Sequence, residues 1–428
     1  MIRRVAAFAL LPLATTAIYA GWYAQRSLFF SFFLYELNVE AGTLSHAYEL
    51  SFYAGVVGTM VAALLGLGLG GRLVLLLGTV CTAVSMAALV VSEPLLASEQ
   101  LTIYPLLATV AFSQGMLGPA LYACAADAMQ AEWGALRTAT IAAIYGAVNA
   151  SALATTLGSE AMGQIVGAGA IFGASAMLVG ATIWVPLVLI FAPGEPEESD
   201  PANTLNPERL GLSVGLIAML AVPMSIHWHV STHWWNIAQS LSNAQTGVGA
   251  AAWMSVNPAT IAAIVPMLVM SLVALQVSRI EVPDLLPAGL GMMLTALSSF
   301  ILTFDPATTP AQVYGAAFVI GSVGELLFAA FIVSRVLGDA HWRLTTGLAA
   351  GWMLANRLGP MILNIIIPID SSAGAPTWML WGDIALTMTA GLGLLIAAGP
   401  VYQWTLSDRV QEDLDEAWED GETKLAAP

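Results

Sequence analysis

FVIGSVGELLFAAFIVSR, residues 318–335, is the stretch that decides the fold, because it places a carboxylate inside an apolar segment. Glu325 lies near the middle of a run that extends from Gln312 to Leu337. Such a run can cross a bilayer, which needs about 20 apolar residues. An ionisable side chain at that depth costs about 2.5–3.5 kcal/mol on insertion scales, so it normally faces a cavity or a partner. We therefore predict a functional role for Glu325; a protonated acid held between helices is the alternative.

The composition is that of a polytopic helical membrane protein. Mean hydropathy is +0.79, and only 9% of the residues are charged, which excludes an ordinary soluble globule. The formal charge of −16 is concentrated in two segments, residues 195–200 and 408–422. An acidic chain whose only lysine is Lys424 is not expected to bind nucleic acid. Cys81 and Cys124 each fall in an apolar segment, so no disulfide framework is expected.

Apolar runs separated by charged residues or by Gly and Pro predict an all-α fold with twelve transmembrane helices. Their ranges are about 5–35, 44–66, 72–92, 101–126, 137–158, 162–192, 210–239, 255–278, 284–304, 311–337, 344–368 and 376–404. The long polar interruption at 193–209 divides them into two sets of six. We therefore expect a six-helix bundle at 1–192, a cytoplasmic linker at 193–209, a second six-helix bundle at 210–406 and an acidic cytoplasmic tail at 407–428.

Arginine and lysine positions predict the orientation in the membrane. Counting spans from a cytoplasmic N-terminus places almost all of them on the cytoplasmic side or at its edge: Arg3, Arg4, Arg72, Arg137, Arg209, Arg279, Arg335, Arg343, Arg409 and Lys424. The loops assigned to the outer side carry neither residue type. This positive-inside pattern predicts an integral protein of the plasma or inner membrane with both termini in the cytoplasm.

Two arginines lie within predicted spans and need partners. Arg26, in the outer part of the first span, is expected to pair with Glu49 as part of an outer gate; snorkelling to the interface is the alternative. His46 is a further candidate for coupling or gating. Arg357, near the middle of the eleventh span, is a candidate counter-ion for Glu325. Both interpretations require two spans to bring opposite charges together.

The seventh predicted span carries three histidines in the stretch HWHVSTHWWN, residues 227–236. His229 and His233 are four residues apart and would share a helix face. No cysteine or acidic motif accompanies them, so we expect a wet, cavity-facing stripe that senses pH rather than a metal site. His227, His229 or Glu325 is expected to couple a proton, and His233 is a further candidate for coupling or gating. Four further polar residues lie within spans, each either a ligand contact or a link between helices: Gln114, Tyr145, Asn149 and Asn257.

Two six-helix halves joined by a cytoplasmic loop resemble the major facilitator architecture, in which the halves rock around a central site. Within it, several motifs resemble the proton-coupled oligopeptide transporter family. They are, in chain order, WYAQR at 22–26, the H-x6-Y spacing from His46 to Tyr53, GMLGP at 115–119 followed by AAD at 125–127, YGAVNAS at 145–151, SVNP at 255–258, GELLF at 324–328 and GWML at 351–354. The resemblance implies that Asn257 and Glu325 hold the amino end of a peptide, with Asn149 and Tyr23 at the cavity.

Other positions depart from that family's pattern. Its E-x-x-E-R signature would fall over Thr15, Ile18 and Tyr19, and its lysine in the fourth helix is replaced by Gly118. We therefore expect a secondary transporter for a small peptide-like, zwitterionic or amine-bearing solute, with a proton as the candidate coupling ion. The alternative is a transport-inactive scaffold subunit of a larger membrane complex. No nucleophile–base pair or ligand cluster predicts an enzyme, a metal or a cofactor.

Overall fold

A computed structural model describes residues 2–36, 39–91, 103–129, 133–192, 207–230, 232–243, 249–305, 308–338, 340–367 and 375–425. Every regular element in these ranges is helical. The first group comprises α1 (Ile2–Ser31), the short π-helix η1 (Phe32–Glu36), α2 (Ala41–Val91), α4 (Ile103–Ala128), α5 (Gly134–Val166), α6 (Ala168–Gly180) and α7 (Trp184–Phe191). The second comprises α8 (Pro207–Val230), α9 (Thr232–Asn243), α10 (Ala250–Met254), α11 (Val256–Val277), α12 (Leu285–Ile301), α13 (Ala311–Gly338), α14 (Trp342–Ile366) and α15 (Thr377–Leu425).

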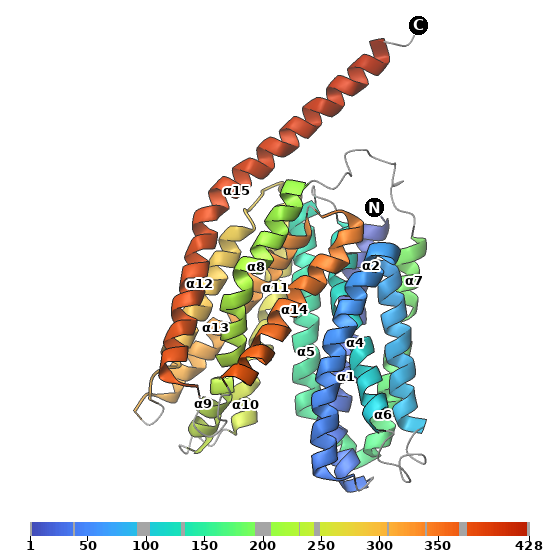
Figure 1. Cartoon of the computed structure of the whole chain (residues 1–428), viewed down its shortest axis with the longest axis vertical. Helices are drawn as coiled ribbons and strands as arrows, with labels where there is room; N and C mark the ends of the chain where they lie inside the picture. The colour runs from blue at the N-terminus through green and yellow to red at the C-terminus, as the bar shows by residue number, and fades with distance from the viewer. Residues whose placement is uncertain are drawn as a thin grey trace.

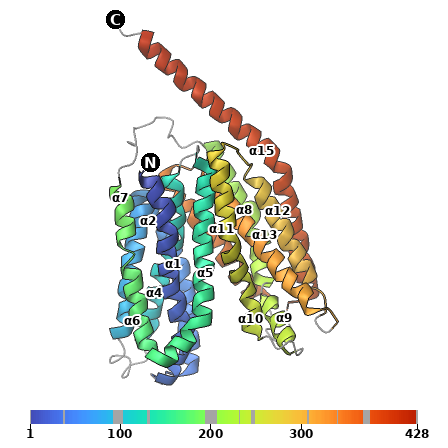
Figure 2. The ribbon, with the colours of Figure 1, turned by 180° about the vertical axis from the view of Figure 1, so that it is seen from behind.

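Eight of the described helices are long and apolar enough to cross a membrane, and α12 is a shorter apolar helix. The chain is therefore an integral membrane protein, as the composition indicated. The first group of helices lies on one side of the molecule and the second group on the other (Figure 1). The two groups meet where α5 lies beside α11, an arrangement that is also visible from behind (Figure 2).

The predicted spans 44–66 and 72–92 form one 51-residue element, α2, which reverses direction at Gly70. Before this residue, Gly55 and Gly58 lie against Ala111 and Phe112 of α4, so the first part of α2 runs parallel to α4. After it, contacts with α4 pass from Ala123 back to Leu117 as α2 advances. Gly70 has φ 73°, a left-handed conformation that glycine adopts at no steric cost, and this allows the tight reversal.

Two predicted spans are interrupted in the structure. The span expected at 162–192 is broken at Gly167, which has φ 83°, and again between α6 and α7, so residues 162–166 belong to the end of α5. The span expected at 210–239 ends at Val230, and α9 begins at Thr232. Hydropathy could not locate the first break, because Gly167 lies in a mainly apolar stretch; the second falls in the polar stretch HWHVSTHWWN, which was assigned to a single span. The predicted linker lies largely outside the described residues, at 193–206, and α15 continues to Leu425 through most of the predicted tail (Figure 1).

One end of the bundle, which we call the basic end, holds Arg137 of the first group of helices and Arg335 of the second. Buried Arg137 of α5 donates to the Ser334 hydroxyl of α13 at 3.1 Å and to the Gly338 carbonyl oxygen at 3.2 Å. Arg335 donates to the Thr405 hydroxyl of α15 at 3.2 Å. These contacts place the start of α5, the end of α13 and residue 405 of α15 at the same level.

Candidate functional site

Glu325 is the fifteenth of the 28 residues of α13 and is half-buried, as the sequence predicted for an acid at mid-membrane depth. The residue before it fixes how α13 lies against α12. A Cβ atom on Gly324 would come within 2.6 Å of the Gly291 carbonyl oxygen, and one on Gly291 would come equally close to the Gly324 oxygen. Only glycine at both positions permits this approach, which holds the helix that carries the acid close to its neighbour.

Both oxygens of the Glu325 carboxylate accept a hydrogen bond. The Tyr145 hydroxyl of α5 donates to Oε1, and the Asn257 side-chain amide of α11 donates to Oε2 at 2.8 Å. Tyr145 belongs to the first group of helices, whereas Asn257 and Glu325 belong to the second. The carboxylate therefore joins the two groups at the middle of the molecule.

Arg357 does not pair with Glu325, so the counter-ion interpretation is wrong for this conformation. The two carboxylate oxygens are already occupied by donors from α5 and α11, and Arg357 of α14 instead lines a cavity in the half of the molecule opposite the basic end. Sequence neighbours such as α13 and α14 need not turn their polar side chains toward each other. Asn149 also lies apart from the carboxylate contacts, because its amide donates to the Tyr145 carbonyl oxygen, one turn back in α5, at 3.0 Å.

The cavity has a volume of about 300 Å³ and is bounded by α1, α2, α4, α6 and α14. Its wall is largely aromatic, and it contains two guanidinium groups and no carboxylate; the polar and aromatic members are Tyr19, Trp22, Tyr23, Gln25, Arg26, Phe29, Tyr48, Ser51, Phe52, Gln114, Phe172 and Arg357. The predicted cavity residue Tyr23 lies here, with its ring centroid 6.1 Å from that of Tyr19. The lining therefore suits a ligand that has an apolar body and an anionic group.

Two buried glutamines of this lining have hydrogen-bonding capacity that no described group satisfies. Gln114 is 6% exposed, and neither its amide nitrogen nor its oxygen has a partner in the described part of the chain. Gln25 is 4% exposed, and its amide nitrogen likewise has none there. A buried polar group without a partner costs about 1–3 kcal/mol, so these amides favour a polar guest in the cavity.

Arg26 and Glu49 do not form the predicted gate pair. The Arg26 guanidinium lies over the ring of Tyr48, 5.6 Å from its centroid, which is a cation–π distance. Tyr48 faces α1, where its ring is 6.3 Å from that of Phe29, and Glu49 is one residue further on, about 100° around the helix. Glu49 is therefore exposed, as is the predicted gating residue His46.

The two histidines whose side chains the structure describes, His227 and His229, do not form a wet stripe. His229 and His233 lie in different helices, α8 and α9, and the side chain of His233 is outside the described residues. His227 and His229 are 3% and 4% exposed. The His229 ring bonds the carbonyl oxygen of Ile367, just past α14, at 2.9 Å. Within the described ranges, no three His, Cys, Asp or Glu side chains gather in a way that could hold a metal.

His227 instead contacts Asp383 of α15, a residue that the sequence analysis did not single out. Its Nδ1 lies 3.3 Å from both carboxylate oxygens. The Asp383 side chain is 1% exposed and also accepts from the Thr387 hydroxyl at 3.2 Å. Asp383, like Glu325, is an acid inside an apolar run, so the same pattern marks it as a candidate.

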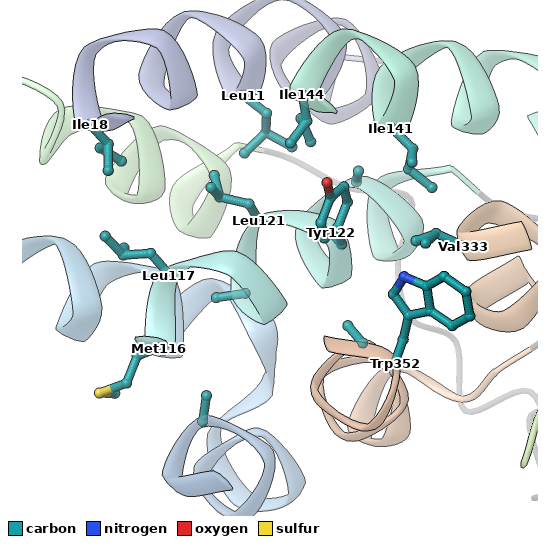
Figure 3. Packing of buried hydrophobic residues seen from close by; sticks show 14 of the residues in the cluster. Leu11, Ile18, Met116, Leu117, Leu121, Tyr122, Ile141, Ile144, Val333 and Trp352 are labelled. Atoms are coloured by element: carbon teal, nitrogen blue, oxygen red, sulfur yellow. The ribbon is translucent and has the colours of Figure 1, made fainter. Parts of the chain in front are cut away.

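The two groups of helices are closed against each other between Glu325 and the basic end. Side chains of α4, α5, α13 and α14 gather there, including Tyr122, Ile141, Val333 and Trp352 (Figure 3). The rings of Phe328 and Trp352 lie 5.5 Å apart. Nearer the basic end, the Thr345 hydroxyl of α14 donates to Asp127 of α4 at 2.8 Å. An apolar layer and a polar layer thus close this side, while the aromatic cavity lies on the other.

Neither a family model nor a curated protein sequence matches the chain. Solved structures match it over most of its length. The POT family transporter PepTSo is 13% identical over 93% of this chain and 98% of its own, with a TM-score of 0.52. The proton:xylose symporter XylE is 12% identical over 91% and 94%, with a TM-score of 0.65. A bacterial homologue of the iron transporter ferroportin is 11% identical over 92% and 99%, with a TM-score of 0.64.

At these identities the likeness shows the fold, which is that of the major facilitator transporters. POT family peptide transporters are among the neighbours, as the sequence motifs indicated. The neighbours' names include a peptide transporter, a sugar symporter and a relative of an iron transporter. The fold alone therefore does not determine a substrate.

Proposed function

We propose that this chain, which has the fold of the major facilitator transporters, is a secondary transporter with twelve spans in two six-helix halves. Its substrate is a small polar solute, peptide-like, zwitterionic or amine-bearing. Alternating access moves the solute between the halves, and a proton is the candidate coupling ion. Both termini lie in the cytoplasm, so the basic end is the cytoplasmic end.

The observation that carries this proposal is the Glu325 carboxylate held between the halves. Tyr145 reaches it from one half, and Asn257 from the other. A cationic group on a solute would compete with these two neutral donors for a charged acceptor, and it adds a charge–charge attraction that neutral donors lack. Binding at Glu325 would therefore loosen a contact that ties the halves together, which links binding to movement.

The cavity lined by Arg357 and Arg26 supplies positive charge for the anionic group of such a solute. Its two guanidinium groups and unpartnered Gln114 amide suit an anionic group such as a carboxylate. A zwitterionic solute would have its cation at Glu325 and its anion toward Arg357.

Uptake into proteoliposomes tests the proposal, with alanyl-alanine as a zwitterionic probe and putrescine as an amine probe. We expect the unsubstituted protein to accumulate at least one of them, and Glu325→Gln to reduce that uptake by about tenfold or more, since it removes the charge that pairs with the cation. Glu49→Gln is the matched control, because Glu49 is an exposed acid of α2 without a described partner at the site.

Unchanged uptake in Glu325→Gln would remove this acid from the mechanism. If the unsubstituted protein accumulates neither probe, the proposed substrate class is wrong. Thermal unfolding of each variant in detergent separates loss of transport from loss of the fold.

A further inference from the structure

The His227–Asp383 contact is a buried pair of ionisable groups that the proposed solute site does not use. It joins α8 to α15, both in the second half of the chain. Both side chains are more than nine-tenths buried, and the wall around the imidazole is aromatic: the rings of Trp228 and Trp234 lie 5.7 and 5.4 Å from it. Ionisable groups inside a membrane are costly, so their retention indicates a function by default.

The helices packed against α8 are α9, α13, α14 and α15, and their ionisable groups are placed as follows. Asp383 faces His227 from α15. Glu325 is the acid at the middle of α13. On α14, Arg357 lines the aromatic cavity, and Arg343 is at the basic end. The other groups of α8 lie elsewhere: His229 bonds Ile367, and Glu208 and Arg209 begin the helix, about 27 Å away at 1.5 Å per residue. His233 of α9 has no described side chain.

We propose that His227 and Asp383 form a proton-binding site buried between α8 and α15, separate from Glu325. With His227 neutral and Asp383 ionised, the pair carries one negative charge. A hydronium ion transfers a proton to Nε2, the imidazole nitrogen that does not face Asp383: the N–H bond forms, one O–H bond of the hydronium breaks, and a water molecule leaves. The pair becomes an imidazolium–carboxylate pair without net charge. Burial favours the uncharged pair, because an unbalanced charge in a poorly polarisable interior is costly.

This site would connect the proton to the solute. When the pair is deprotonated, Asp383 and Glu325 are two negative charges in one half of the molecule. A solute cation at Glu325 offsets one of them, so it favours release of the proton, and by linkage the proton disfavours the cation. This consequence rests on the proposed function and predicts that a purely cationic solute exchanges against protons. Proton binding itself requires no solute.

Ring nitrogen NMR of the full chain, labelled with ¹⁵N-histidine in lipid nanodiscs, tests proton binding directly. The chain has five histidines, and the His227 signal is identified by its loss in His227→Gln. We expect the His227 ring to change reversibly between neutral and protonated forms as the pH is varied. Asp383→Asn should move the midpoint of the His227 titration to lower pH, with proton affinity reduced by about tenfold or more. The reason is that an adjacent opposite charge shifts such a midpoint by about one to three pH units.

Thr387→Ala is the matched control, because it removes a donor to the same carboxylate without changing its charge. A His227 ring that stays in one form throughout, or the same midpoint in Asp383→Asn, would reduce the pair to a neutral structural link.

If Asp383→Asn does not fold, Glu325→Gln provides the second measurement: it leaves the pair intact and should shift the midpoint in the same direction. An unchanged midpoint in Glu325→Gln would overturn the connection between the pair and Glu325. None of these readouts needs transport, so they stand apart from failure of the proposed function.

Discussion

At the scale of single residues, removal of the Tyr145 hydroxyl tests whether its hydrogen bond prepares Glu325 to bind the solute. Tyr145→Phe keeps the ring and removes one of the two donors to the carboxylate. A hydrogen bond to a charged group contributes about 1.5–3 kcal/mol, and 1.4 kcal/mol is a factor of ten. If the bond holds Glu325 ready for the solute, we expect uptake of the accepted probe to fall by about tenfold or more at low probe concentration.

Tyr402→Phe is the control for this substitution. The Tyr402 hydroxyl also donates to a glutamate, Glu281, at 3.2 Å, but this pair is exposed at the basic end. Its removal should leave uptake within about twofold, since exposed pairs of this kind contribute about 0–1 kcal/mol. Equal losses in the two variants would mean that Tyr145 contributes only general stability.

The sequence identified the residues that form the Glu325 contact, but it did not show which side chains pair with one another. Glu325, Asn257 and Tyr145 could be named because polar residues inside apolar runs are few. The pairs Arg26–Glu49 and Arg357–Glu325 were wrong, because pairing depends on the rotation of each helix about its axis, and one residue turns a side chain by about 100°. Asp383 was missed although the same reasoning applied to it.

At the scale of the helices, glycines set how closely the two halves approach at the basic end. A Cβ atom on Gly66 of α2 would lie 2.4 Å from the Thr346 Cβ of α14. Gly66→Leu therefore cannot be accommodated while this end is closed. Overpacking costs about 1–3 kcal/mol, which corresponds to roughly tenfold or more in favour of an open basic end.

Cysteine labelling measures this opening. Ala350 of α14 is buried and lies one turn after Thr346, on the same helix face. In a chain without Cys81 and Cys124, we expect Ala350→Cys to react with a membrane-permeant maleimide about tenfold faster when Gly66→Leu is also present. Gly68→Leu is the matched control, since nothing lies within 4 Å of a Cβ at that position. Slow labelling in both double variants would contradict closure through Gly66.

Helix existence was easier to predict than helix boundaries. The range 311–337 agrees with α13 to within one residue, because its apolar run ends at a charged, polar loop. The reversal at Gly70 and the break at Gly167 depend on single glycines with positive φ inside apolar sequence. Many other glycines of this chain sit in regular helix, so the sequence alone does not mark which ones interrupt it.

At the scale of the whole molecule, hydropathy could predict the membrane fold but not its conformation. Closure at the basic end depends on contacts such as Arg137 with Gly338 and Thr345 with Asp127, which join helices more than 190 residues apart. A transporter that alternates between two such arrangements has states of similar free energy, and one sequence encodes both. Which of them is occupied therefore cannot be derived from patterns along the chain.

Orientation is the remaining property of the whole molecule, and two exposed positions on either side of α12 test it. Ser278 follows α11 beside Arg279, and Thr308 precedes α13; both are exposed. If α12 spans the membrane and the arginines face the cytoplasm, Thr308→Cys should react with a membrane-impermeant maleimide in intact cells. Ser278→Cys should react only in inverted vesicles. Cys81 and Cys124 are replaced in both variants. Because arginines near short loops set orientation, the reversed result would contradict the positive-inside assignment, and labelling of both positions from one side would mean that α12 does not cross.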